Sequence, residues 1–183
     1  FKNGDFPPIL IPFKSIPEII RCLEDVDGVV DIAITKNQIA FMGSNFYLTS
    51  RVVDGIFPDY KQIIPKSVTT EAVLLKEDAL GALHLANIFT DKFSQISFGV
   101  YPKSKKFEIK SKNADTGESA QNISSDLSGE DLDINFNYRY VIDAFQSINS
   151  DSVTFSFNGT QKPLAIKGIS DGSFLYLVMP MNR

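Results

Sequence analysis

Two residue types that often carry enzymatic chemistry occur once each in this chain of 183 residues. A Ser-His-Asp triad, a Cys-His pair or an HExxH zinc site would each have to use His84, the single histidine. Its surroundings, ALGALHLANIF, hold no nucleophile or metal ligand at a useful spacing. The single cysteine, Cys22, excludes an internal disulfide and a zinc–thiolate cluster and fits a reducing, cytoplasmic compartment. The sequence therefore predicts a protein without an active site, metal or cofactor.

Other motifs that could support chemistry are incomplete. Asp25 and Asp27 in DVDG match the start of a calcium loop, but the later ligands and the closing glutamate are missing, so the string is interpreted as a turn. Neither G-x-G-x-x-G nor a Walker lysine motif occurs. Acidic pairs such as Glu130-Asp131 are frequent, so an enzyme that uses carboxylates stays open as an alternative.

Charge and composition set limits on the class of protein. Eighteen basic residues against 22 acidic ones give a net charge of −4, which excludes a nucleic-acid binder that is basic all over but leaves room for a local basic face. Hydrophobic residues make up 43% of the chain and no apolar run reaches the roughly 18 residues of a membrane span. Phe1 stands where a complete chain begins with Met, so we expect a piece of a longer protein.

An internal repeat organises the chain. Three amphipathic helices are predicted from apolar residues at positions i, i+3, i+4 and i+7, and the second and third begin 63 and 122 positions after the first. The apolar residues are Ile16, Ile19, Ile20 and Leu23, then Ala79, Ala82, Leu83 and Ala86, then Tyr138, Val141, Ile142 and Phe145.

Each predicted helix has similar flanks, with one short apolar strand before it and three strands after it. The leading strands are Ile9–Pro12, Glu71–Leu75 and Leu132–Phe136. The strands that follow read DIAIT, IAFMG and FYLTSRVV in the first copy, QISFGVY, FEIKSK and ESAQNIS in the second, and SVTFSFN, PLAIKG and SFLYLVM in the third. The sequence therefore predicts an α+β fold made of three β-α-β-β-β units.

One such unit has an apolar sheet face that it cannot bury alone, so two units are expected to pack as a pair. Residues 65–183 then form one complete domain with two units, and residues 1–64 form half of another. For the complete domain we expect two helices side by side in one layer, two sheets and the same strand order in both units.

Three strings in the chain resemble the bacterial sliding clamp family, the beta subunit of the replicative DNA polymerase. They are SRVVDGIFPDYKQIIPK at 50–66, NFNYRYVIDAF at 135–145 and YLVMPMNR at 176–183. The resemblance implies a DNA-clamp fold in which sheets lie outside and helices line a hole around duplex DNA. It makes residues 1–64 the C-terminal half of clamp domain 2 and residues 65–183 the whole of clamp domain 3.

The resemblance also implies a function without catalysis. Such a ring is a processivity factor, a homodimer that tethers polymerase, clamp loader and repair proteins to DNA in the bacterial cytoplasm, at the nucleoid. A sliding ring needs only weak phosphate attraction. The candidates for that attraction are basic residues at exposed positions of the helices: Lys14, Arg21, Lys76 and Arg139.

A peptide pocket between domains 2 and 3 is the second site that the resemblance implies. Carried over by motif, its walls are Pro58, Gln62, Ile63, Asn137, Tyr140, Pro163, Leu177, Val178, Met179, Pro180 and Met181. Methionine adapts to varied apolar anchors, and Tyr and Asn can orient a ligand by hydrogen bonds. Gln62 departs from the family, which often has arginine there, and so removes a charge from the rim.

The short polar strand ESAQNIS is expected to be an exposed edge that takes part in the dimer interface. The residues assigned to this interface are Ile88, Phe89, Glu118, Gln121 and Ile123. Besides the enzyme, one further alternative stays open: a free-standing α+β module that binds proteins and shares only the repeat.

Overall fold

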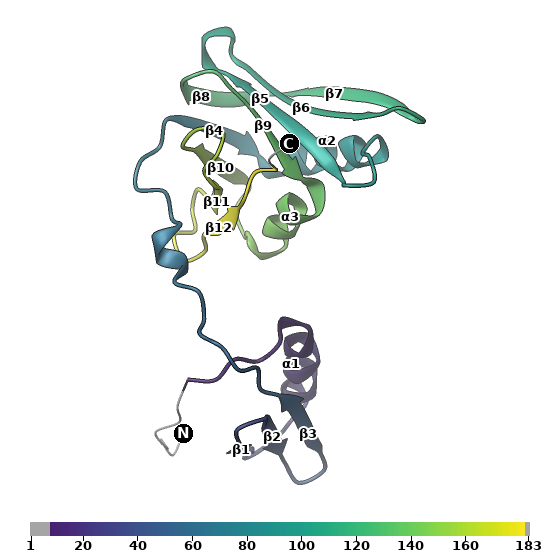
Figure 1. Ribbon diagram of the computed structural model, residues 1–183, viewed down its shortest axis with the longest axis vertical. Helices are drawn as coiled ribbons and strands as arrows, with labels where there is room; N and C mark the ends of the chain where they lie inside the picture. The colour runs from purple at the N-terminus through teal and green to yellow at the C-terminus, as the bar shows by residue number, and fades with distance from the viewer. Residues whose placement is uncertain (1–7, 182–183) are drawn as a thin grey trace. The chain divides into compact units, whose positions relative to one another are not determined.

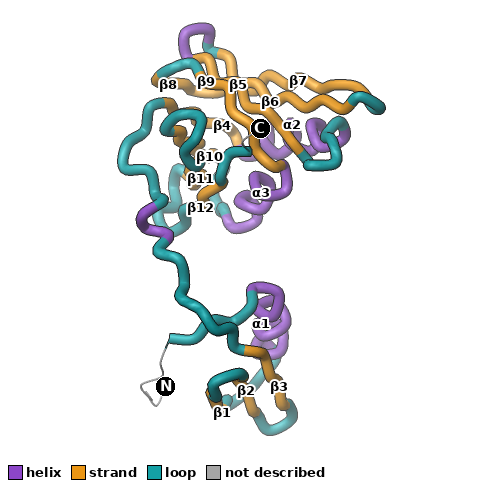
Figure 2. The backbone as a smooth tube through the Cα atoms, viewed as in Figure 1, coloured by secondary structure: helices purple, strands orange, loops and turns teal. Residues whose placement is uncertain are grey.

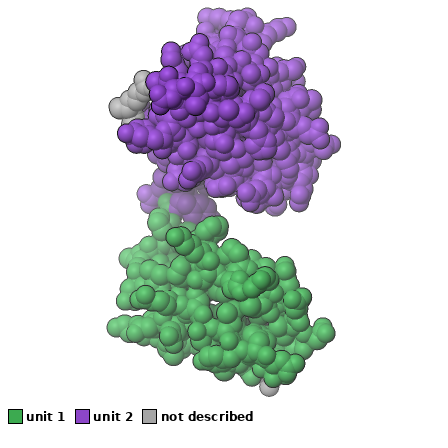
Figure 3. All heavy atoms as spheres, turned by 90° about the vertical axis from the view of Figure 1, so that its right-hand side faces the viewer, with its two compact units in different colours: residues 1–59 green, residues 60–183 purple. Residues whose placement is uncertain are grey.

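The computed structural model describes residues 8–181, so the last two residues of the YLVMPMNR string lie outside the described part. The chain divides into two units, Phe1–Asp59 and Tyr60–Arg183 (Figures 1 and 3). This division falls five residues before the expected boundary at 64/65. Each unit is described by itself below.

The first unit is one helix packed on a small antiparallel sheet. Its elements are η1 (Phe13–Ser15), α1 (Ile16–Glu24), β1 (Asp31–Ile34), β2 (Gln38–Met42) and β3 (Tyr47–Arg51), in the sheet order β1-β2-β3. Ile19 of α1 packs with Ile39 and Phe41 of β2. The predicted leading strand Ile9–Pro12 is wrong: a single bridge between Leu10 and Val53 is all that forms there. The second unit shows why, because there a leading strand pairs with the other copy of the repeat, and residues 8–59 hold one copy only.

The second unit holds two copies of the repeat. The first consists of β4 (Thr70–Leu75), α2 (Lys76–Ile88), β5 (Gln95–Tyr101), β6 (Lys106–Asn113) and β7 (Gly117–Ile123), preceded by η2 (Tyr60–Gln62) and with η3 (Pro102–Ser104) between β5 and β6. The next consists of β9 (Leu132–Asn137), α3 (Tyr138–Asp143), η4 (Ala144–Ser147), β10 (Ser152–Phe157), β11 (Leu164–Gly168) and β12 (Tyr176–Val178). Between the copies lies β8 (Ser125–Gly129).

The two copies exchange their leading strands. The sheet orders are β12-β11-β10-β4-β8 and β7-β6-β5-β9, so β4 joins the sheet of the second copy and β9 joins that of the first. Apart from β8, the two orders are the same, which confirms the predicted internal symmetry. The helices α2 and α3 contact each other on one side of the two sheets (Figure 2).

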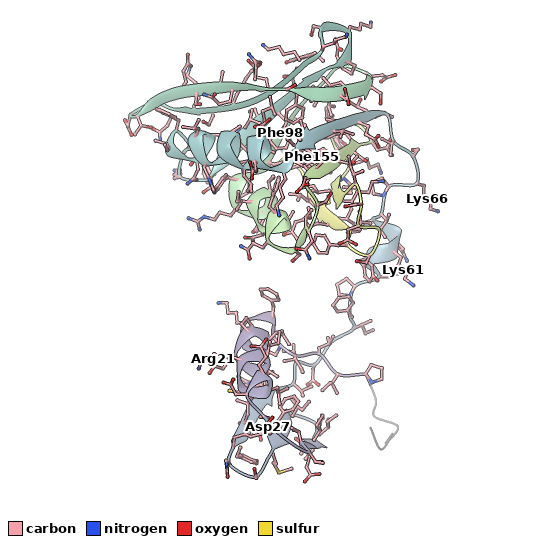
Figure 4. All side chains as sticks on the ribbon, turned by 180° about the vertical axis from the view of Figure 1, so that it is seen from behind. Arg21, Asp27, Lys61, Lys66, Phe98 and Phe155 are labelled. Atoms are coloured by element: carbon pink, nitrogen blue, oxygen red, sulfur yellow. The ribbon has the colours of Figure 1, made fainter. Side chains whose placement is uncertain are left out.

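The core lies between the sheets and the helices. Phe98 of β5 and Phe155 of β10 (Figure 4) are fully buried, with ring centroids 5.7 Å apart. Phe107 packs on both rings. All four predicted apolar positions of α2 are buried. In α3 the helix ends at Asp143, and the predicted Phe145 is buried from η4 instead.

The strand β8 was not predicted, because SDLSG has one apolar residue and no clear alternation. It forms through long-range pairing with β4, in the register Ala72 to Leu127. Thr70 Oγ1 donates to the Glu130 carbonyl and so links the start of β4 to the residue that follows β8. No helix in the described part of the chain is long and apolar enough to cross a membrane.

Candidate functional site

The last described residues form a segment that joins the two sheets of the second unit. At its start Val178 is buried and pairs with Leu164 of β11. At its end the Met181 N–H donates to the Asn135 carbonyl of β9, at 2.8 Å. Between these two anchors Met179 is 56% exposed, and Pro180 has no N–H to donate. We call residues 178–181 the terminal segment; it holds an exposed methionine on a backbone that is fixed at both ends.

The start of α3 lies close to the terminal segment. Met181 is bound to Asn135 of β9, and β9 runs directly into α3. Asn137 is the N-cap: its Oδ1 accepts from the Arg139 N–H at 2.9 Å. The Asn137 amide also donates from Nδ2 to the Phe93 carbonyl at 2.9 Å. One turn into α3, Tyr140 is 60% exposed. The structure therefore assigns Asn137 to holding the helix and leaves Tyr140 available to a ligand.

Sequence reasoning missed three residues of this region. Burial, followed by the negative charge of Asp143 and the neighbouring Tyr140, raises the pKa of the Tyr176 hydroxyl. The Tyr176 ring stacks on Phe174 with centroids 6.2 Å apart. Tyr176, Asp143 and Phe174 therefore lie in the same region as Tyr140. An aromatic pair two positions apart in the predicted last strand was the available signal.

The other expected wall residues lie on separate elements. Pro163 is buried where β11 begins, and Leu177 is half-buried in β12. Gln62 ends η2, and the Ile63 N–H donates to the Tyr60 carbonyl, leaving the Ile63 side chain half-exposed. Pro58 is exposed and belongs to the first unit.

These residues offer apolar contact with few polar groups. Met179, Leu177 and Ile63 provide aliphatic surface, while Tyr140 provides a ring and a hydroxyl. Such a mixture suits a short peptide with apolar anchors. Two cavities, of about 410 and 450 Å³, lie elsewhere, and neither lining includes an expected pocket residue.

The carboxylates give little support to an enzyme. Burial alone would raise the pKa of Glu108, but Lys110 at 2.6 Å and Lys106 at 2.9 Å outweigh it, and the pKa lies below its ordinary value. A general acid at neutral pH needs the opposite shift. No group of acidic, histidine and cysteine side chains that could hold a metal occurs among the described residues.

The four expected DNA-facing residues differ in their surroundings. Lys14 is exposed in η1 and Arg139 in α3, while Arg21 pairs with Glu18 at 2.6 Å. Lys76 is half-buried, and its ammonium donates to the Ile148 carbonyl, which ties α2 to the end of η4. The helices α1, α2 and α3 together carry three basic and five acidic residues, so acidic side chains outnumber basic ones on them.

Among the described residues, the strand β7 is an edge of its sheet and pairs with β6 alone. On it Glu118 is exposed and lies 3.4 Å from Lys112, Gln121 is half-buried and Ile123 is buried. At the end of α2, Ile88 is exposed, and the half-buried Phe89 lies close to Gly117. An open backbone edge beside an exposed aliphatic side chain is suited to pairing with another strand.

Comparison with known proteins decides the family. The C-terminal domain of the DNA polymerase III beta subunit matches residues 61–182, and the central domain of the same subunit matches residues 2–59. The chain belongs to the beta sliding clamp family. The resemblance of the three strings and the clamp fold are thereby confirmed.

Relatives place the chain within this family. The beta sliding clamp of Bacillus subtilis strain 168 is 29% identical over 95% of this chain. The crystal structure of the B. subtilis clamp superposes with a TM-score of 0.81 at 28% identity, covering 98% of this chain and 49% of that one. The Caulobacter crescentus pol III beta structure gives 0.84 at 26% identity, covering 100% and 49%. The chain spans about half the length of the curated relatives it matches, 47% for the B. subtilis protein.

Proposed function

We propose that this chain is the C-terminal part of a sliding clamp, a processivity factor without catalysis that encircles duplex DNA. The match of two successive clamp domains along residues 2–182 carries this proposal. In it, residues 1–59 supply the second half of clamp domain 2 and residues 60–183 supply clamp domain 3. The protein would act in the bacterial cytoplasm, at the nucleoid, and tether polymerase, clamp loader and repair proteins.

The part of this function that the chain can carry by itself is peptide capture. The terminal segment, Tyr140 and Ile63 form the binding wall, with Met179 as the central apolar contact. The Met179 side chain is exposed and can contact a ligand, whereas its neighbour Val178 is buried in the core.

Peptide capture is tested with a fluorescein-labelled peptide that carries the clamp-binding motif of a bacterial replicative polymerase. We expect Met179→Ala to weaken binding about tenfold, which corresponds to about 1.4 kcal/mol for one apolar contact. Lys14→Ala, in η1 of the first unit, is the matched control and should leave binding within twofold. Equal affinities for Met179→Ala and the unchanged chain would show that the wall is assigned to the wrong residues.

We further propose that β7 forms one side of a homodimer interface, with Glu118, Gln121, Ile123, Ile88 and Phe89 near it, in the full-length protein. The support is the open edge and the exposed Ile88. Adding Lys or Pro in place of Gln121 in the full-length chain should shift the dimer toward monomer in analytical ultracentrifugation. An unchanged dissociation constant for both variants would argue against β7.

We propose contact with DNA for Lys14, Arg21, Arg139 and Lys76; the Lys76 ammonium also donates to the Ile148 carbonyl. Phosphate contacts in a clamp are independent of base sequence and depend on salt. Lys14→Ala with Arg139→Ala in the full-length ring should lower the salt dependence of DNA retention, measured by sliding lifetime on circular DNA. A salt dependence equal to that of the unchanged ring would remove these residues from the DNA path.

A further inference from the structure

Strand β9 is connected to its neighbour β5 by side chains as well as by its backbone. Tyr101 donates to Asp133 at 2.6 Å, and Ser97 donates to Asn135 at 2.5 Å. Asn137 donates to the Phe93 carbonyl, just before β5, at 2.9 Å. Residues 133, 135 and 137 alternate along the strand, so their side chains share one face of the sheet. We call these three bonds the β9 ladder.

The other edge of β9 carries the terminal segment. In the sheet order β7-β6-β5-β9 this strand is the last, so its second backbone edge is open to the Met181 N–H. Asn135 thus has two tasks: its side chain accepts from Ser97 and its carbonyl accepts from Met181. The position of Met181, and with it that of Met179, depends on where the β9 backbone lies.

The same strand sets the start of α3. Asn137 uses one end of its amide to cap α3 and the other to hold the Phe93 carbonyl. A small rotation of Asn137 would therefore move the helix turn that carries Tyr140. Neither end of this amide needs a ligand to be satisfied, because both already have partners within the fold.

We propose that Ser97, Asn135 and Asn137 are positioning residues of the peptide site. Through the β9 ladder they hold Met179 and Tyr140 in a fixed geometry. This inference rests on the proposed peptide capture; it adds Ser97 and Asn135 to that site as residues outside the pocket wall and gives Asn137 a positioning role. Fixed contact groups raise affinity because less conformational entropy is lost when the ligand binds.

The rungs of the ladder provide a matched control. Ser97 pairs with Asn135, whose carbonyl also accepts from the Met181 N–H. Tyr101 lies two residues beyond Gly99, the register partner of Asp133, and its hydroxyl reaches back to the Asp133 side chain. On β9 the two rungs end at Asn135 and Asp133, which at about 3.3 Å per residue lie roughly 7 Å apart, and the Asp133 rung is the one farther from α3. Ser97→Ala removes the middle rung, Asn137→Ala removes the rung at the helix, and Tyr101→Phe removes one hydroxyl at the far end.

The experiment measures two quantities on the intact chain. Hydrogen exchange of the Met181 amide without peptide reports whether the terminal segment stays anchored, and fluorescence anisotropy with the labelled polymerase-motif peptide reports affinity. We expect Ser97→Ala and Asn137→Ala to speed Met181 exchange and to raise the peptide Kd three- to tenfold. Tyr101→Phe should change both quantities less than twofold, although its effect on thermal unfolding should be similar to that of Ser97→Ala.

The outcomes separate the two proposals. If Met181 exchange and affinity are unchanged in Ser97→Ala and Asn137→Ala, or if Tyr101→Phe changes them equally, the positioning role is overturned. If the unchanged chain binds no peptide but Ser97→Ala still releases Met181, the anchoring role is supported and the proposed peptide capture fails.

Discussion

The same repeat appears in both units, but the units bury it to different degrees. In residues 60–183 the rings of Phe98, Phe107 and Phe155 are fully enclosed. In the first unit a small cluster around Ile19, Ile39 and Phe41 is the buried core, while Phe13 is 84% and Ile56 96% exposed. One helix on three strands cannot enclose its apolar face, whereas two copies that exchange leading strands can.

This difference shows that the unit of stability is the pair of repeats. The leading strands demonstrate it most directly. β4 and β9 each run six residues because each pairs with a strand of the other copy. The equivalent Ile9–Pro12 segment, beside a single copy, keeps one bridge to Val53.

The largest expected effect comes from removing the centre of the paired core. Phe155 contacts four other phenylalanine rings, so Phe155→Ala should destabilise residues 60–183 by about 3–5 kcal/mol. Phe41→Ala, in the first unit, should cost less because its small cluster lies near solvent and can collapse. Hydrogen exchange followed separately in each unit measures both, and a larger loss for Phe41→Ala would reverse the comparison.

A smaller loss of stability is expected from displacing β8, the edge strand that pairs with β4 in the second unit. Gly129 has φ +100°, and a Cβ there would lie 2.0 Å from the Thr69 carbonyl oxygen. Gly129→Ala should therefore lower the unfolding free energy of the second unit by about 2–4 kcal/mol through backbone strain and displacement of β8. Urea unfolding checks this; a loss below about 0.5 kcal/mol would show that β8 adapts easily.

The charged triad on β6 should make the second unit sensitive to acid. Because the pKa of Glu108 is lowered in the folded chain, its stabilisation is present above the unfolded-state pKa of about 4.3 and is lost as pH falls through the folded value. Glu108→Gln should cost about 1 kcal/mol at pH 7 and little at pH 3. Thermal unfolding at both pH values measures it, and an equal loss at pH 3 would mean that packing, not charge, holds this residue.

The smallest expected effect is a gain in stability of the second unit, which would increase the difference in stability between the two units. Gly81 lies inside α2, and a Cβ there would meet nothing within 4 Å. Gly81→Ala should stabilise the second unit by about 0.5–1 kcal/mol, because alanine restricts the unfolded chain and favours helix. A loss of stability in thermal unfolding would indicate that α2 contacts a neighbour there.

The local hydrophobic pattern of the sequence was enough to predict most of the helices and strands. Periodicities of 3.6 and 2 predicted α1, α2, α3 and nearly every strand, since an amphipathic element shows its buried face in its own residues. The two wrong strand predictions, β8 and Ile9–Pro12, concern segments whose pairing depends on residues far away in sequence. β8 pairs along its length with β4, whereas Ile9–Pro12 makes only the single bridge between Leu10 and Val53.

The sequence by itself determined the repeat, the family strings and the types of side chain at the candidate peptide wall. The tertiary structure alone decided what each of these side chains does. Asn137 became a cap because β9 places it at the start of α3, and the Lys76 ammonium is engaged because η4 ends beside it. Met179 is exposed because Val178 and Met181 are fixed on different sheets. A residue's type sets which bonds it can make, but the packing of distant segments decides which partners come within reach.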